Sequence, residues 1–132
     1  MSEKTQKALE LHKKGYNCAQ CVACVFAEGF GKDEKEVFQL MEGFGFGMGC
    51  MEVCGAVSGM IAVAGMMKSD GNLNEPSTKK LSYRESKAMV DEFQEKIGSI
   101  ICRDIKGVDT GKVLRSCDGC IEDAVAIVER RI

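Results

Sequence analysis

The chain has 132 residues, of which 45% are hydrophobic and 29% are charged, and its formal net charge is -2. Lysine and glutamate are interspersed along the chain, which disfavours nucleic-acid binding through phosphate contacts. The length and the apolar content predict a single domain, residues 1–132, that can bury an ordinary core without disulfides.

The N-terminal region and the longest apolar stretch both argue against export and membrane insertion. Residues 1–10 are polar and have no apolar signal-peptide core. The stretch from Val53 to Met67 has 15 residues and is interrupted by glycines, whereas a membrane-spanning helix needs about 20 apolar residues. We therefore expect a cytoplasmic protein, and in the cytoplasm thiols are normally kept reduced.

The predicted elements are all helices. Asn17 and Asp33 are suitable N-caps, and Gly15 is a suitable helix end. In chain order we expect helices at about 5–14, 18–29, 34–41, 50–67, 78–97, 99–105 and 118–130, with loops at 69–77 and 108–116. No strand alternation and no internal repeat is found. The fold class is therefore all-α, a compact bundle of five or six helices with a glycine-rich loop before the central apolar helix.

Helical spacing assigns the core-facing residues of three of these helices. For the third helix they are Val37, Phe38, Leu40 and Met41. For the long helix they are Leu81, Ala88, Met89, Phe93 and Ile97. For the last helix they are Ile121, Ala124, Val125 and Val128.

Four glycines between residues 43 and 49 alternate with Phe44, Phe46 and Met48. This pattern predicts a flexible loop or a sharp corner, because glycine adopts backbone angles closed to other residues. A phosphate site is disfavoured here, since no Gly-Lys-Ser/Thr ending follows and no strand leads into the loop. A lid over the cysteines is the better interpretation.

The eight cysteines are the main functional signal. They fall into four groups along the chain: Cys18, Cys21 and Cys24; Cys50 and Cys54; Cys102; and Cys117 and Cys120. Grouped cysteines form disulfides, bind metals as thiolates or carry redox chemistry. In a reducing compartment the last two uses are favoured.

Cys18 lies in the first turn of its predicted helix. Unpaired backbone N–H groups and the helix dipole favour a thiolate there, so we expect a lowered pKa. Cys21 shares that face of the helix, whereas Cys24 lies further round and is expected to pack in the core as a small hydrophobic residue. His12, the only histidine, is expected to be solvated on a polar face.

Cys50 and Cys54 are four residues apart at the expected start of the apolar helix. If the helix begins by Cys50, both thiols lie on one face. Gly55 and Gly59 follow at the same spacing, which permits close approach of a second backbone and could bring another cysteine near Cys54. Close packing by itself also explains these two glycines.

Cys117 and Cys120 form a CxxC at the start of the last helix, a spacing used by redox disulfides. This pair and the pair Cys18 and Cys21 could together form a four-sulfur metal site. Zinc ribbons, however, usually place their two pairs about 15–20 residues apart, and these pairs are almost a chain length apart. The zinc-finger interpretation is therefore weakened, although packing could still bring the two pairs together.

Several segments together resemble a known family. They are Tyr16-Asn17-Cys18-Ala19-Gln20, the glycine-rich loop, Val53-Cys54-Gly55-Ala56-Val57-Ser58-Gly59, Ile101-Cys102-Arg103-Asp104-Ile105, and Cys117 with Ile121-Glu122-Asp123-Ala124. The pattern is similar to the C_GCAxxG_C_C family of redox-active proteins. The resemblance implies an all-helical domain of this size whose signature cysteines are Cys18, Cys54, Cys102 and Cys117.

Three functional hypotheses follow. The third is a binding or structural domain whose cysteines only pack in the core. In the first, the signature four carry thiol–disulfide or electron-transfer chemistry. Cys54 or Cys18 attacks, Cys102 and Cys117 resolve, and Cys120 is a local partner of Cys117. In the alternative the same four bind zinc or an iron–sulfur cluster, with Cys21, Cys50 or Cys120 as extra ligands. The resemblance keeps this alternative open, because a related domain in some multihaem proteins holds an iron–sulfur cluster.

The expected partner is a redox protein or a small thiol. Neither nucleic acid nor a membrane is expected as a partner, and a homodimer stays open.

Overall fold

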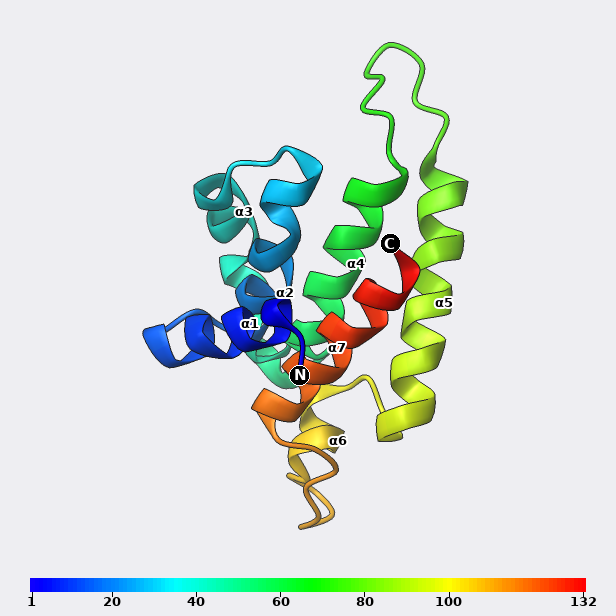
Figure 1. Ribbon diagram of the computed structural model, residues 1–132. Coiled ribbons are helices and arrows are strands. Elements are labelled where there is room, and N and C mark those ends of the chain that lie inside the picture. Colours follow the sequence, from blue (N-terminus) through cyan, green and yellow to red (C-terminus); the bar gives the residue numbers. More distant parts are fainter.

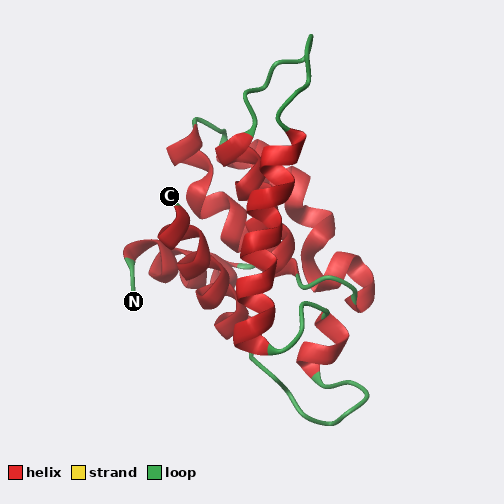
Figure 2. Ribbon diagram, turned by 90° about the vertical axis from the view of Figure 1, so that its right-hand side faces the viewer, coloured by secondary structure: helices red, strands yellow, loops and turns green.

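The computed structural model describes residues 1–132 and contains helices but no β-sheet (Figures 1 and 2). The α-helices are α1 (Glu3–Lys14), α2 (Cys18–Ala27), α3 (Glu34–Met41), α4 (Gly55–Lys68), α5 (Lys79–Ile97), α6 (Cys102–Lys106) and α7 (Cys117–Arg131). The all-α prediction is confirmed. The number of α-helices is seven rather than five or six, since the short helix predicted at about 99–105 forms an element of its own, α6, which ends at Gly107 in the left-handed conformation.

The sequence signals at the first two helices act as predicted. Asn17 accepts a hydrogen bond from the backbone N–H of Gln20, and the Gln20 side chain accepts one in return from the Asn17 N–H, which makes a capping box. Gly15 ends α1 at φ 119°, an angle that favours glycine. The tight link between α1 and α2 fixes where Cys18 begins its helix.

The core centres on α2, α4 and α7, and α4 packs most extensively against α2. Gly59 allows this approach, because a Cβ atom there would lie 2.6 Å from the carbonyl oxygen of Ala19. The predicted inward residues of α7 are all buried: Ile121, Ala124, Val125 and Val128. The close approach of α2 and α4 places the start of one helix beside the start of the other.

Two residues predicted to face the core are exposed instead. Leu40 is 72% exposed, because the buried face of the two-turn helix α3 consists of Val37 and Met41, four residues apart. Leu81 is 47% exposed, because the buried stripe of α5 begins only at Glu85, one turn later. Both errors concern short or terminal helical segments that neighbouring helices cover on one side only.

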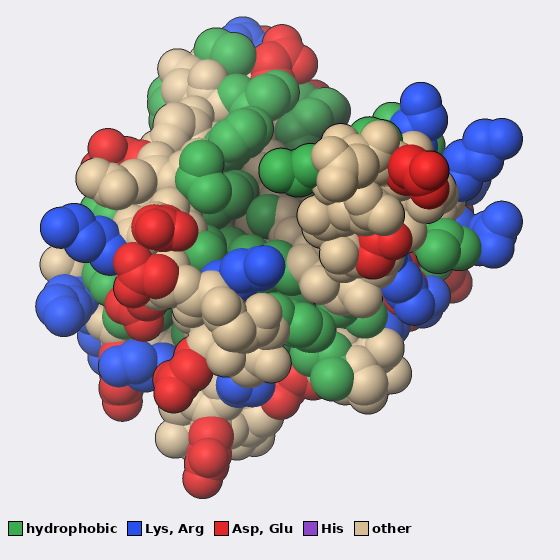
Figure 3. All heavy atoms as spheres, turned by 90° about the horizontal axis from the view of Figure 1, so that it is seen from above, with side chains coloured by type: hydrophobic (Ala, Val, Ile, Leu, Met, Phe, Trp, Pro, Cys, Tyr) green, Lys and Arg blue, Asp and Glu red, His purple; other side chains and the backbone are tan.

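The two ends of the bundle differ. At one end the segment between α4 and α5, residues 69–78, projects as a loop (Figures 1 and 2). A view onto that end shows hydrophobic side chains in a hollow, with acidic and basic side chains interspersed around it (Figure 3). The opposite end carries α6 and the first turns of α4 and α7. None of the helices has both the length and the apolar character needed to cross a membrane.

Candidate functional site

The chain between α3 and α4 folds into a tight corner. Phe46, Met48 and Met51 have φ angles of 54°, 60° and 60°, which are unusual for residues other than glycine. Gly47 has φ 59°, and a Cβ atom there would lie 2.8 Å from the Cβ of Cys102. This glycine therefore lets the corner pack directly against α6.

The corner corrects the predicted start of the apolar helix. Residues with left-handed backbone angles flank Cys50 and prevent a continuous right-handed helix, so α4 begins at Gly55 rather than near Cys50. Cys54 is the N-cap of α4. Cys50 is exposed in the corner, where its thiol donates to the carbonyl oxygen of Gly47 at 3.6 Å. The prediction that Cys50 and Cys54 share one helical face is therefore wrong.

Backbone pairing brings Cys54 and Cys102 together. The N–H of Cys54 donates to the carbonyl oxygen of Ile100 at 2.7 Å, and the N–H of Cys102 donates to that of Glu52 at 2.6 Å. These two bonds flank an isolated antiparallel bridge between Val53 and Ile101. Two cysteines that are 48 positions apart in the sequence are thus held by main-chain geometry rather than by their side chains.

Cys18 and Cys117 are the first residues of α2 and α7, and each helix has a polar N-cap. At α7 the hydroxyl of Ser116 accepts a hydrogen bond from the N–H of Gly119 at 2.9 Å. A Cβ atom on Gly55 would lie 3.1 Å from the Cβ of Cys18, so glycine at this position lets Cys18 approach the start of α4. The close approach that the glycine spacing predicts is therefore present.

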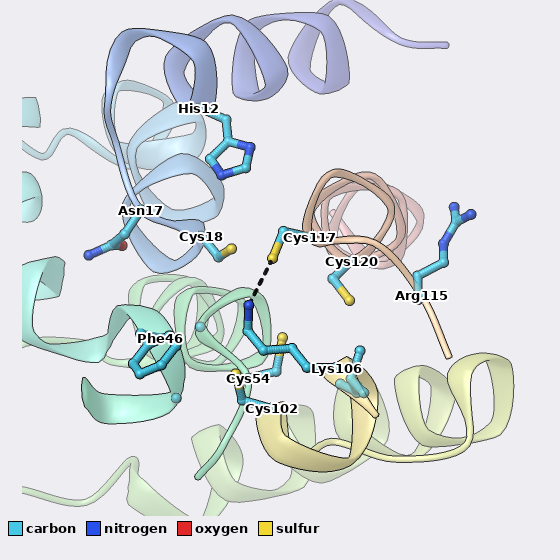
Figure 4. Close-up of a pocket in the computed structure, with 13 residues that line it drawn as sticks. His12, Asn17, Cys18, Phe46, Cys54, Cys102, Lys106, Arg115, Cys117 and Cys120 are labelled. Atoms are coloured by element: carbon cyan, nitrogen blue, oxygen red, sulfur yellow. Dashed lines mark hydrogen bonds between the residues drawn. The ribbon is translucent and has the colours of Figure 1, made fainter. Parts of the chain in front are cut away.

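These elements surround a cavity of about 150 Å³. Five cysteines line it: Cys18, Cys54, Cys102, Cys117 and Cys120. Figure 4 shows their sulfur-bearing side chains converging from α2, α6, α7 and the start of α4. The structure thus brings the four signature cysteines to one place and adds Cys120. Cys21, Cys24 and Cys50 do not line this cavity.

Cys117 and Cys18 form one pair of thiols in the cavity. The neighbouring Cys18 thiol lowers the pKa of Cys117 to about 5, and Cys117 in turn raises the pKa of Cys18. Lys106 also favours the Cys117 thiolate, since its Nζ lies 3.8 Å from the Cys117 Sγ. Burial further raises the pKa of Cys18. The lowered pKa predicted for Cys18 is therefore wrong; the thiolate is favoured on Cys117, at the start of the other helix.

Cys54 and Cys120 form a second pair. The neighbouring Cys120 thiol lowers the pKa of Cys54 to about 7, and Cys54 in turn raises the pKa of Cys120. The N–H groups of Ala56 and Val57 also support the Cys54 thiolate. Burial raises the pKa of Cys102, which belongs to neither pair. The pocket therefore holds two pairs, each with one thiol that ionises readily and one that does not.

The sequence interpretation missed the pocket's basic residues. Lys106 Nζ lies over the ring of Phe46, 5.6 Å from its centroid, and no carboxylate pairs with it. His12 lines the cavity and its Nδ1 lies 2.6 Å from Asp118 Oδ1, so it is not simply solvated. The guanidinium of Arg115 is paired with Asp123. One signal was available, since Lys106 lies one helical turn after Cys102.

Cys21 and Cys24 belong to the core of α2 rather than to the pocket. Their thiols contact the carbonyl oxygens of Tyr16 and Glu34 at 3.7 and 4.0 Å. Burial raises the pKa of Cys21 to about 12 and that of Cys24 to about 11. The packing role predicted for Cys24 is therefore what the structure has, and Cys21 shares it.

The alternative prediction, a metal or iron–sulfur site, requires several side chains arranged around one ion. No group of three or more histidine, cysteine, aspartate or glutamate side chains is arranged to hold a metal ion. Although five sulfurs line one cavity, they do not form a ready coordination site for zinc or an iron–sulfur cluster in this arrangement. All eight cysteines are free thiols.

The helical fold and the cavity define a class, that of all-helical proteins with several thiols gathered in one pocket. The chain belongs to the C_GCAxxG_C_C family, described as "Putative redox-active protein", whose model matches residues 16–131. This range includes all five pocket cysteines. No curated protein and no solved structure matches the chain.

Proposed function

We propose that the protein is a thiol–disulfide oxidoreductase whose reacting pair is Cys117 and Cys18. The observation that carries the proposal is that a half-buried, readily ionised thiol and a second thiol line one cavity. Family membership supports redox chemistry in general terms. The proposal takes residues 1–132 as one domain that works in the cytoplasm.

The reaction begins at Cys117, because thiolates and not thiols attack disulfides. The Cys117 thiolate attacks one sulfur of a substrate disulfide, the substrate S–S bond breaks, and the second substrate sulfur leaves as a thiolate. The Cys18 thiol then gives its proton to the departing thiolate and attacks the Cys117 Sγ. The bond between Cys117 and the substrate sulfur breaks, this sulfur leaves as a thiolate, and Cys18–Cys117 becomes a disulfide.

The substrate gains two electrons in this reaction and the protein loses two. A dithiol, supplied by a redox partner protein or by a small thiol, reverses the reaction and restores the starting state.

Three cationic or polar groups suit this assignment. Lys106 lies beside the Cys117 sulfur, His12 adds positive potential when protonated, and the start of α7 presents free N–H groups. Cys117 therefore takes the attacking role, in place of the resolving role assigned to it by sequence. Cys18 takes the resolving role, since its proton is held most firmly when Cys117 is ionised.

The test is oxidation of the reduced protein by an excess of a small disulfide, followed by acid quenching, alkylation and peptide mapping. A Cys18–Cys117 disulfide that returns to two thiols on treatment with a dithiol is the expected result. Cys18→Ala removes this disulfide, whereas Cys21→Ala, on the same helix but outside the cavity, retains it. If no cysteine pair cycles in the native protein, the proposed function is wrong.

A cysteine-bound metal or iron–sulfur cluster is the second candidate, favoured by the convergence of five sulfurs on one cavity. Binding would require the sulfurs to shift, because no three of them are placed to hold an ion. Anaerobic purification followed by metal and sulfide analysis separates the candidates. Stoichiometric metal or sulfide would replace the exchange proposal, and a colourless, metal-free protein with reactive thiols would remove this candidate.

A further inference from the structure

The inner pair of pocket thiols is left unused by the proposed reaction. Cys54 is 6% exposed and Cys120 is 2% exposed, whereas Cys117 and Cys18 are half-buried. All four line the same cavity of about 150 Å³ (Figure 4). Cys120 is not one of the four signature cysteines, so this pair needs an explanation from the structure of this chain.

Three structural features place the inner pair for chemistry. Cys54 is fixed at the start of α4 by its backbone bond to Ile100. Cys120 is one turn into α7, after Cys117, and its side chain lines the same cavity as that of Cys54. In Figure 4 the sulfur of Cys54 lies between those of Cys117 and Cys102, and the side chain of Cys120 lies beside that of Cys117. The inner pair is thus next to the outer pair but shielded from solvent.

We propose that Cys54 and Cys120 form a second dithiol couple, which takes over the disulfide from Cys18–Cys117 and gives the pocket a capacity of four electrons. This inference rests on the proposed function, because the outer disulfide is formed by the substrate reaction.

The transfer balances without any external reagent. The Cys54 thiolate attacks the Cys18 Sγ, the Cys18–Cys117 bond breaks, and Cys117 leaves as a thiolate beside Lys106. The Cys120 sulfur then attacks the Cys54 Sγ, the Cys54–Cys18 bond breaks, and Cys18 leaves and takes the proton that Cys120 loses. One disulfide, one thiolate and one thiol are present before and after. The outer pair is again reduced and reacts with a second substrate disulfide.

The ionisation states of the two pairs match this sequence. Cys54, which attacks first, has a lowered pKa, and so does Cys117, which leaves first. A sulfur of low pKa is the better leaving group in thiol–disulfide exchange. Cys18 and Cys120, which exchange the proton, both have raised pKa values. The pocket therefore contains a donor and an acceptor for each step.

The experiment uses the full chain with Cys50→Ser, because Cys50 is an exposed thiol outside the cavity and would form disulfides between molecules. The reduced protein is treated with an excess of oxidised glutathione, quenched in acid, alkylated and mapped. The expected result is the loss of four thiols per chain, as Cys18–Cys117 and Cys54–Cys120, with Cys21, Cys24 and Cys102 still reduced. Cys120→Ala is expected to lose two thiols only.

The route is tested by kinetics. In Cys117→Ser the outer disulfide cannot form, so oxidation of the shielded Cys54–Cys120 pair is expected to slow by about 100-fold, because access limits thiol–disulfide exchange. Cys24→Ser, a buried thiol outside the cavity, is the matched control and is expected to leave this rate unchanged.

The outcomes separate the two proposals. Loss of two thiols in the parent protein, as Cys18–Cys117, would overturn the second couple and leave the proposed function intact. A Cys117–Cys120 disulfide would overturn the pairing proposed for both couples. An unchanged rate for Cys54–Cys120 in Cys117→Ser would overturn the transfer, and loss of no thiols would overturn the proposed function itself. The mapping of the parent protein requires no pocket variant and so does not depend on the folding of one.

Discussion

Helix α2 carries cysteines in two regions of the molecule, and the two regions differ in the groups that surround each thiol. Cys18, at its first position, lines the cavity and contacts another thiol. Cys21 and Cys24, one and two turns later, are enclosed by the core, and their thiols donate to carbonyl oxygens. The residue type and the helix are the same, so the difference arises from what the fold places opposite each thiol.

Cys18, Cys54 and Cys117 lie at helix starts, whereas Cys21 and Cys24 lie inside α2 and donate to carbonyl oxygens. Helix starts present free N–H groups and a positive dipole, which stabilise a thiolate. Burial among side chains without such groups opposes ionisation, and it raises the pKa of Cys21 to about 12. Cys117 has a pKa of about 5 under the influence of Cys18, Lys106 and His12. Reactivity is therefore expected only at the pocket.

The largest expected effect comes from replacing the pocket thiolate. Cys117→Ser is expected to lower the rate of small-disulfide reduction by about 100-fold, because the serine hydroxyl is not ionised near neutral pH. The rate is followed by the release of a coloured thiol. Cys21→Ser, in the core region, is the comparison and is expected to retain the rate. Equal loss in both variants would mean that the two regions do not differ in reactivity.

The second effect concerns the contact that joins the two regions. Gly59→Ala places a Cβ atom 2.6 Å from the Ala19 carbonyl oxygen, which forces α2 and α4 apart. We expect a loss of about 1–3 kcal/mol of unfolding free energy, as for other overpacked cores, measured by urea denaturation. Gly65→Ala is the matched control on the same helix, since nothing lies within 4 Å of its Cβ position. Its stability is expected to be unchanged or higher, because alanine favours helix.

A third prediction tests the electrostatic part of the comparison. Lys106→Met removes the cation beside Cys117, so the pKa of Cys117 is expected to rise from about 5. Below the new pKa the thiolate is partly protonated. A rise of one pKa unit, which corresponds to 1.36 kcal/mol, should therefore lower the alkylation rate at pH 4 by up to about tenfold. Above pH 8 the thiolate is present in both proteins and the difference should disappear.

The pH profile of alkylation is the measurement for this variant. Lys112→Met, an exposed lysine in the following loop, serves as the control. An inflection that stays near pH 5 in Lys106→Met would show that the dipole and Cys18 suffice to hold the thiolate.

The sequence predicts where α2 begins and where two helices approach each other better than it predicts the reactivity of each thiol. Asn17 marks where α2 begins, and the spacing of Gly55 and Gly59 predicts the close approach of a second helix. These are local signals, in which a residue type sets a backbone geometry. The resemblance to a family identified the four signature cysteines, and these line the cavity. Their spacing in the sequence does not by itself predict that residues so far apart lie together.

The chemistry of each thiol depends on contacts that the sequence does not encode locally. Cys18 has a raised pKa because Cys117, 99 positions later, lies opposite it. Lys106 reaches Cys117 across the cavity and stacks on Phe46 from the glycine corner. The left-handed residues of that corner also moved the start of α4 past Cys50. Long-range packing thus decides which thiols react, while local signals decide where helices begin.

The smallest effect is expected from replacing a thiol of the core region, which should change stability but not redox chemistry. Cys24→Ala removes one buried sulfur that packs in the core and contacts the Glu34 carbonyl oxygen. The cavity left by one sulfur atom is expected to cost about 1 kcal/mol of unfolding free energy. The number of thiols lost to oxidised glutathione should stay the same as in the parent protein, because Cys24 lines no part of the pocket. Denaturation and thiol counting on the same sample measure the two quantities together. A change in the thiol count would mean that the core thiols exchange with the pocket, since a packing role alone would alter stability and nothing else.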